Sequence, residues 1–185
     1  MMDASVIKTK LGKQSEFVAL VLVNSNEYYK ASTSLVKFLT TSKNIPGVYL
    51  TVNKPFSVLN ENFKKEGIRN DLIIFIDAIT NLSDSKLEEN EHCYYLESPE
   101  NLSDISIALS EAIESIDHKE KFIFIDSLST LLIYNNPETV TKFIHFLVGK
   151  MRAWNAIGVI LSLKKRGEGS LIAEIGQFCD MTIEL

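Results

Sequence analysis

The segment FIFIDSLSTLL, residues 122–132, decides the fold class of this chain. Its first four residues are all apolar, without the polar alternation of a strand that has one face in water. Asp126 ends this run and Ser127 follows it. A continuous apolar strand of this kind is typical of a parallel sheet that is covered by helices on both faces.

Six further apolar runs accompany this segment, at residues 17–23, 47–52, 72–78, 93–98, 157–163 and 181–185. Between them the apolar residues recur at intervals of three and four, which predicts helices over 35–39, 55–67, 102–116, 137–154 and 171–178. The alternation predicts an α/β fold, a doubly wound and mostly parallel sheet in three layers. We expect a single domain over residues 1–185, with an N-terminal extension at 1–15 and an acidic flexible loop at 80–92.

The bulk composition is that of an ordinary globular domain, with 45% hydrophobic residues and a net charge of −5. This charge gives no electrostatic footprint for nucleic acid, so nucleic acid is not an expected partner. Two cysteines lie far apart, outside any zinc or redox motif. The longest apolar run, Phe17 to Val23, is far too short to span a membrane, and residues 1–16 lack the apolar core of a signal peptide. We therefore expect a cytoplasmic protein.

Two of the predicted strands end in an aspartate that fits the Walker B pattern, in which a carboxylate after four apolar residues holds hydrated magnesium. Asp126 ends one of them, and Asp77 ends the other, in IIFIDA at 73–78. Both cannot serve one nucleotide site, so the pattern needs its context.

Residues 23–32, VNSNEYYKAS, lie between the first strand and the first helix, where a phosphate-binding loop would lie. In the motif GxxxxGK[ST], glycines let backbone N–H groups surround the phosphates, the lysine contacts them, and the hydroxyl binds magnesium. The frame set on Lys30 puts Asn24 and Tyr29 at the glycine positions and Ala31 at the hydroxyl position, with Ser32 one residue late. Only the lysine matches, so the Walker A loop is degenerate.

Taken together, these segments resemble the RecA superfamily of ATPases, and within it the KaiC-like branch common in archaea. The resemblance rests on LVNSNEYYKASTSLVKFL (22–39), GVYLTVNKP (47–55), FIFIDSLSTLL with Asp126 and Ser127, and FIHFLVGKMRAWNAIGVILSL (143–163). It implies a RecA-like P-loop NTPase core that covers nearly the whole chain.

The resemblance also shows where this chain departs from active relatives. In those, an acidic residue after the second strand activates the attacking water, and the matching positions here are Asn53 and Lys54. An amide cannot act as a general base, and a lysine is protonated at neutral pH. Because the phosphate cradle and the catalytic base are both altered, we expect a pseudo-ATPase. It would need no cofactor and would act through protein contacts, in regulation or signalling.

Two alternatives stay open. Lys30, Ser32 and Asp126 could hold ATP in an atypical loop, with Asp126 as the magnesium ligand, in an ATP-binding protein or weak ATPase. A receiver-like domain with Asp77 as acceptor needs an acidic pair after the first strand, where only Glu27 is acidic.

The lysines near the strand ends have two interpretations of their own. Lys30 and Lys54 could compensate the charge of a buried Asp126 in a structural remnant of the site. They could instead bind a phosphate-bearing ligand without metal.

The loop KKRGEGS, 164–170, follows the sixth strand. KaiC-like rings place basic residues here against a neighbouring subunit, so the resemblance makes Lys164, Lys165 and Arg166 interface candidates. It implies a homo-oligomer, or a complex with an active relative, and no membrane partner.

Overall fold

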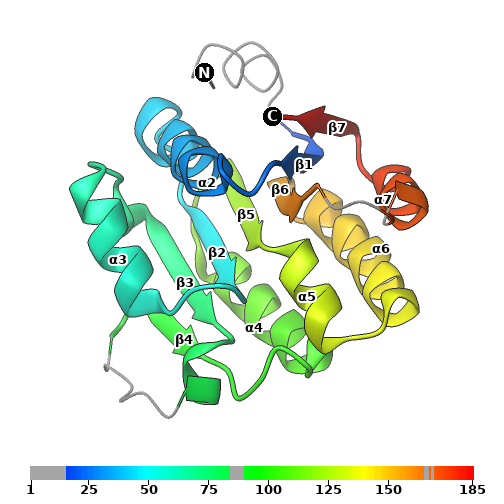
Figure 1. Ribbon diagram of the computed structural model, residues 1–185. Helices are drawn as coiled ribbons and strands as arrows, with labels where there is room; N and C mark the ends of the chain where they lie inside the picture. Colours follow the sequence, from blue (N-terminus) through cyan, green and yellow to red (C-terminus); the bar gives the residue numbers. More distant parts are fainter. Residues whose placement is uncertain (1–15, 84–89, 165–166, 168) are drawn as a thin grey trace.

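The computed structural model describes residues 16–83, 90–164, 167 and 169–185, and its strands form one sheet (Figure 1). The strand order is β4-β3-β2-β5-β6-β1-β7, and every neighbouring pair is parallel. The strands are β1 Val18–Val23, β2 Gly47–Thr51, β3 Ile73–Asp77, β4 Cys93–Tyr95, β5 Lys121–Asp126, β6 Ala156–Leu163 and β7 Met181–Glu184. The predicted α/β class is confirmed, with a sheet that is wholly rather than mostly parallel.

Helices cover both faces of the sheet and form the two outer layers of the three-layer fold (Figure 1). On one face lie α2 Tyr28–Lys37 and α3 Phe56–Lys65, over a core rich in aromatic rings. On the other lie α4 Leu102–Ser115, α5 Leu128–Tyr134, α6 Pro137–Ala153 and α7 Gly169–Gly176, over an aliphatic core. Two separate cores of this kind explain why β1, β5 and β6 are apolar along almost their whole length.

The longest described helix, α6, illustrates how the sequence sets helix boundaries. The side chain of Asn136 accepts a hydrogen bond from the Thr139 amide at 2.9 Å, and Pro137 stands in the first turn. Its buried side chains recur at helical spacing, from Val140 to Met151. It has 17 residues, and no helix in the described part of the chain is long and apolar enough to cross a membrane.

The structure departs from the predicted elements in several places. The helix predicted at 35–39 begins earlier, at Tyr28, and continues as a π-helix over Phe38–Ser42. The pattern predicts no helix at Leu128–Tyr134, because seven residues are too few to show a helical repeat. The strand predicted over 93–98 ends at Tyr95.

The predicted flexible regions fall largely outside the described residues. This holds for the extension at 1–15 and for residues 84–89 of the acidic loop. The start of that loop is ordered: Thr80–Ser83 form a 3-10 helix in which Thr80 is buried.

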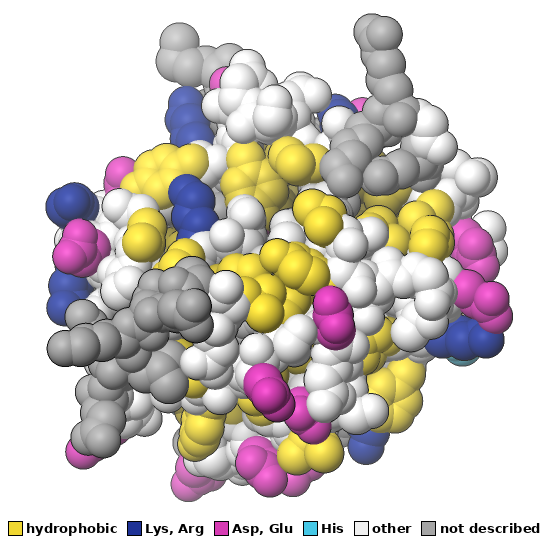
Figure 2. All heavy atoms as spheres, turned by 60° about the horizontal axis from the view of Figure 1, so that its bottom comes forward, with side chains coloured by type: hydrophobic (Ala, Val, Ile, Leu, Met, Phe, Trp, Pro, Cys, Tyr) yellow, Lys and Arg dark blue, Asp and Glu magenta, His cyan; other side chains and the backbone are white. Residues whose placement is uncertain are grey.

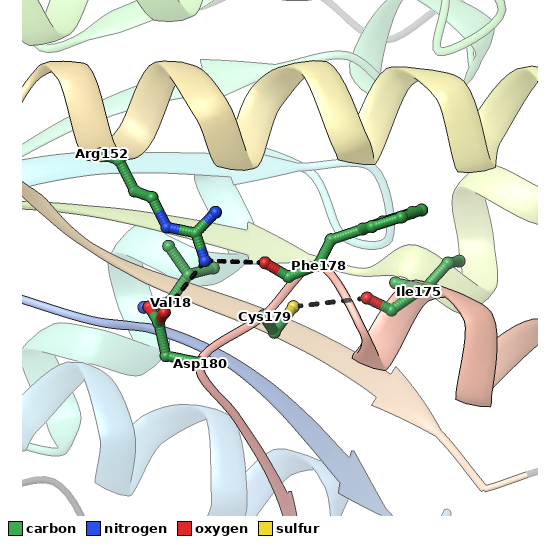
Figure 3. Close-up of polar contacts among 6 residues, drawn as sticks. All are labelled: Val18, Arg152, Ile175, Phe178, Cys179 and Asp180. Atoms are coloured by element: carbon green, nitrogen blue, oxygen red, sulfur yellow. Dashed lines mark hydrogen bonds and ion pairs between the residues drawn. The ribbon is translucent and has the colours of Figure 1, made fainter.

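A polar contact fixes the C-terminal strand to the sheet (Figure 3). The carboxylate of Asp180 accepts hydrogen bonds from the Val18 amide at 2.7 Å and from Arg152 Nη2 at 2.9 Å. Burial alone would raise the pKa of Asp180, but these two partners outweigh it and hold the pKa below its ordinary value. Arg152 also donates to the Phe178 carbonyl, so α6 is joined to the segment that leads into β7.

The close approach of β2 and β5 gives a test of this packing. A Cβ atom on Gly47 would lie 2.4 Å from the ring and from the carbonyl oxygen of Phe122. The backbone would have to move to relieve this steric overlap. We expect Gly47→Ala to lower the free energy of unfolding by about 2–3 kcal/mol, measured by urea denaturation.

The control for this measurement is Gly149→Ala, on the exposed side of α6, where a Cβ atom would meet nothing within 4 Å. Alanine favours a helix over glycine, so this variant should gain up to about 1 kcal/mol. Equal effects of the two substitutions would show that the contact between β2 and β5 is not tight.

Candidate functional site

The candidate site lies where β1, β2 and β5 end. Asp126 is in register with Thr51 of β2 and with Leu161 of β6, so these carboxyl ends lie side by side. Because α2 connects β1 to β2, it crosses β6 and β5, and this brings its first turn to the end of β5. Figure 2 shows this end of the molecule, with hydrophobic side chains in the middle, Lys and Arg mostly at the upper left, and Asp and Glu toward the lower part.

The central group is the carboxyl of Asp126, which is 2% exposed. The hydroxyl of Tyr28, in the first turn of α2, donates a hydrogen bond to its Oδ1 atom. The hydroxyl of Tyr49, in β2, donates to its Oδ2 atom at 2.5 Å. Each carboxyl oxygen therefore holds a tyrosine hydroxyl, and the three side chains connect β5, α2 and β2.

The ring of Tyr49 is fixed by the aromatic core. It stacks on Phe124 with ring centroids 4.9 Å apart, and Phe63 meets it edge-on. Burial raises the pKa of Tyr49, so its hydroxyl stays protonated and remains a donor. Its oxygen also lies 3.2 Å from the hydroxyl of Ser32, which joins Ser32 to Asp126 through the tyrosine.

The hypothesis that a lysine compensates Asp126 is wrong for this structure. The polar partners of its carboxyl are the two tyrosines, whereas Lys30 is exposed and Lys54 lies against the ring of Tyr29. Burial raises the pKa of Asp126 to about 7. The carboxyl is thus held by neutral donors rather than by a cation.

The other residues aligned with the phosphate loop do not gather at Asp126. Asn24 is exposed, and its carbonyl accepts the Glu27 amide at 3.0 Å in a tight turn. Ala31 is fully buried in the core. Tyr29 is 41% exposed, and its hydroxyl lies 3.5 Å from the carboxylate of Glu66, the residue that follows α3.

The segment after β2 is a turn at the surface. The hydroxyl of Thr51 donates to the Lys54 carbonyl at 2.6 Å, which closes the turn around the exposed Asn53. The ammonium of Lys54 lies 5.2 Å from the ring centroid of Tyr29, a cation–π distance. Lys54 and Tyr29 therefore meet each other beside the site rather than within it.

Ser127 faces a small group of hydroxyls behind Asp126. Its Oγ lies 3.0 Å from both Ser129 Oγ and Thr130 Oγ1 at the start of α5. Ser129 Oγ accepts in turn from the Leu163 amide at 3.3 Å. This network joins the end of β5 to the end of β6, and the peptide bond between Asp126 and Ser127 is cis.

The second aspartate that fits the Walker B pattern, Asp77, has a different environment. It is fully buried, and its carboxylate accepts from the amides of Phe56, Ile79 and Thr80 and from the Thr80 hydroxyl. These donors close the turn after β3 and fix the start of α3. With four donors on two oxygens, Asp77 is a structural carboxylate, which leaves Asp126 as the aspartate of the candidate site.

The interface candidates after β6 are described only in part. Lys164 forms an ion pair with Glu184 of β7 at 3.0 Å, and its amide donates to the Val23 carbonyl. Lys165 and Arg166 lie outside the described residues. In the part of the chain that the structure describes, no group of three or more His, Cys, Asp or Glu side chains could hold a metal ion.

Sequence reasoning missed both tyrosines that contact Asp126. Tyr49 carried a signal, because a hydroxyl in the middle of a buried strand needs a polar partner. The signal for Tyr28 was weaker. The motif frame assigns a position to its neighbour Tyr29, and Tyr28 itself matches no position with a function. The structure brings together Asp126, Ser127 and Ser32 from the predicted set.

Comparisons with known proteins agree with this fold. A sequence family described as a family of unknown function, DUF7504, matches residues 73–185. No curated protein sequence matches the chain. Among solved structures, a KaiC-like protein from the hyperthermophilic archaeon Pyrococcus horikoshii OT3 matches with a TM-score of 0.65 and 10% identity, over 91% of this chain and 71% of that one. At this identity the match shows a RecA- and KaiC-like fold alone.

The burial of Asp126 predicts how stability depends on pH. Its pKa is about 7 in the folded chain and about 4 in an unfolded one, so the folded state binds more protons between these values. Stability therefore falls as pH rises through this window. Asn cannot titrate, and its amide can still meet both tyrosine hydroxyls. We expect Asp126→Asn to gain about 2–3 kcal/mol relative to the wild type between pH 5 and pH 8.

This expectation is checked by urea unfolding of both proteins at several pH values, with circular dichroism as the readout. If the wild type and Asp126→Asn keep a constant difference across the series, the carboxyl is ionised throughout and its burial is compensated in another way.

Proposed function

The chain belongs to DUF7504, a family of unknown function, and we propose that it is a non-catalytic KaiC-like domain that acts by contact with other proteins. In this proposal it neither hydrolyses ATP nor requires magnesium. The regulatory or signalling role expected from the sequence belongs to the same proposal.

The observation that carries the proposal is the contact between Tyr28 and Asp126. In a P-loop ATPase the Walker B carboxylate holds hydrated magnesium, together with a hydroxyl in the first turn of the helix that follows the phosphate loop. In this chain that helix corresponds to α2. Here the side chain of Tyr28 runs from that turn to the carboxyl, and Tyr49 occupies the second oxygen. Magnesium–nucleotide does not fit these residues unless both tyrosines leave.

The remaining parts of a nucleotide site support the same conclusion. Ser32 carries the hydroxyl nearest in sequence to the magnesium-binding position of the motif. Its side chain is 4% exposed, and its Oγ atom lies 3.2 Å from the hydroxyl of Tyr49. The turn at residues 24–27 uses the Glu27 amide for an internal hydrogen bond, so this amide is not turned toward a phosphate. At the end of β2, Asn53 and Lys54 offer no carboxylate to activate a water molecule.

A domain of this kind would work through its surface. Its partners would be further copies of itself or an active relative, since RecA-like folds assemble through the faces near their strand ends. The net charge of −5 gives no support to nucleic acid as a partner.

The test is calorimetric titration of the purified chain with ATP, with and without magnesium. We expect no saturable binding up to millimolar ATP in either condition, because the free energy of binding would have to exceed the cost of breaking both tyrosine contacts with Asp126. Asp126→Ala should give the same null result.

Micromolar binding that requires magnesium and is lost in Asp126→Ala would overturn the proposal in favour of an ATP-binding protein. Asp117→Ala is the matched control, since this exposed aspartate precedes β5 at the opposite end of the strand. Binding without magnesium that is lost in Lys30→Ala or Lys54→Ala would also overturn it, in favour of a metal-free phosphate site.

A further inference from the structure

A groove at the far edge of the sheet suggests what kind of partner this chain contacts. It lies between β4, the outermost strand on that side, and α4, and its volume is about 360 Å³. None of the residues that line it contacts Asp126. The residues that line it are Tyr94, Tyr95, Leu96, Glu97, Asp104, Ile107, Ala108 and Glu111.

Two large apolar side chains that line the groove are exposed. Ile107 is 56% exposed and Tyr94 is 47% exposed, although both belong to regular elements that cover a core. In α4, Asp104, Ile107 and Glu111 recur at spacings of three and four, so they form one stripe along the helix. Apolar side chains left in water at a sheet edge favour contact with another molecule.

Three acidic side chains line the groove, those of Glu97, Asp104 and Glu111, and none of them is paired with a cation among the described residues. The carboxylate of Asp104 accepts a hydrogen bond from the side chain of Asn101, the N-cap residue of α4. Residues 90–117 carry seven Asp and Glu and no Lys or Arg, whereas the whole chain has a net charge of only −5. The segment that forms β4 and α4 is therefore strongly negative, and three of its carboxylates line the groove.

We propose that the groove between β4 and α4 binds a short basic segment of another protein, in which apolar side chains alternate with Lys or Arg. The apolar side chains would contact Tyr94 and Ile107, and the cations would reach Glu97 and Glu111. Charge complementarity selects this occupant over an acidic or purely apolar one. A groove of this size suits a short linear segment, bound transiently, rather than a folded domain. The inference goes beyond the proposed function and holds whether or not a nucleotide binds near Asp126.

The test uses a fluorescein-labelled peptide, Lys-Leu-Lys-Val-Lys, and the full chain, with fluorescence anisotropy as the readout. We expect saturable binding with a Kd of roughly 10–100 µM at low salt. Ile107→Ser and Glu111→Lys should each weaken it at least tenfold. The peptide Glu-Leu-Glu-Val-Glu should not bind.

The control variant is Glu61→Lys, which makes the same charge change at an exposed position of α3, on the opposite face of the sheet. It should leave the affinity within twofold of the wild type. If it weakens binding as much as Glu111→Lys, the peptide senses only net charge and the groove is not a site. Absence of saturable binding also overturns the proposal.

A second copy of the chain is the competing occupant. Analytical ultracentrifugation of the full chain distinguishes it: we expect Ile107→Ser to leave the sedimentation coefficient unchanged. A dimer that this variant dissociates would mean that the groove is a self-association surface, and the proposal of a basic foreign segment would be wrong.

Discussion

The arrangement of the candidate site depends on one constraint, the burial of the Asp126 carboxyl at the end of a central strand. Removing a carboxylate from water is costly, so the fold must supply donors or a counter-charge, or leave the group protonated. This chain supplies donors: a tyrosine from the neighbouring strand and a tyrosine from the helix above. Burial raises the pKa of Asp126. The contact with Tyr28 holds the first turn of α2 at the end of β5.

The same constraint links the aromatic core to the site. Tyr49 can reach Asp126 because its ring is held by Phe124 of β5 and Phe63 of α3, which belong to the same aromatic core. Packing and polar chemistry are therefore not separable here. A change in the core that tilts Tyr49 would remove a donor from a buried carboxyl, and the cost would exceed the packing alone.

Much of the fold could be read from the sequence, because continuous apolar strands and amphipathic helices leave strong periodic patterns. All seven strands are where the apolar runs predict them, with β4 shorter by three residues. The short helix α5 could not be predicted, because its seven residues are too few to show a helical repeat of apolar positions. The site was harder to predict. Motif frames assign roles by spacing along the chain, whereas the partners of Asp126 are set by register across strands and by a helix that crosses them. The motif frame places Lys30 and Lys54 near Asp126, but neither lysine contacts it. Tyr28 and Tyr49 have no role in the motif, yet their hydroxyls are the groups that bind the Asp126 carboxyl.

The carboxylate of Asp77 has a consequence for the tolerance of this fold to sequence drift. Three of its four donors are backbone amides, those of Phe56, Ile79 and Thr80. Every amino acid except proline carries such an amide, so these three hydrogen bonds depend on the side chain of Asp77 and not on the side chains of the three donor residues. The two loops that meet at Asp77 can therefore change their outward-facing chemistry over evolutionary time without losing their shape. This allows one scaffold to present many different surfaces.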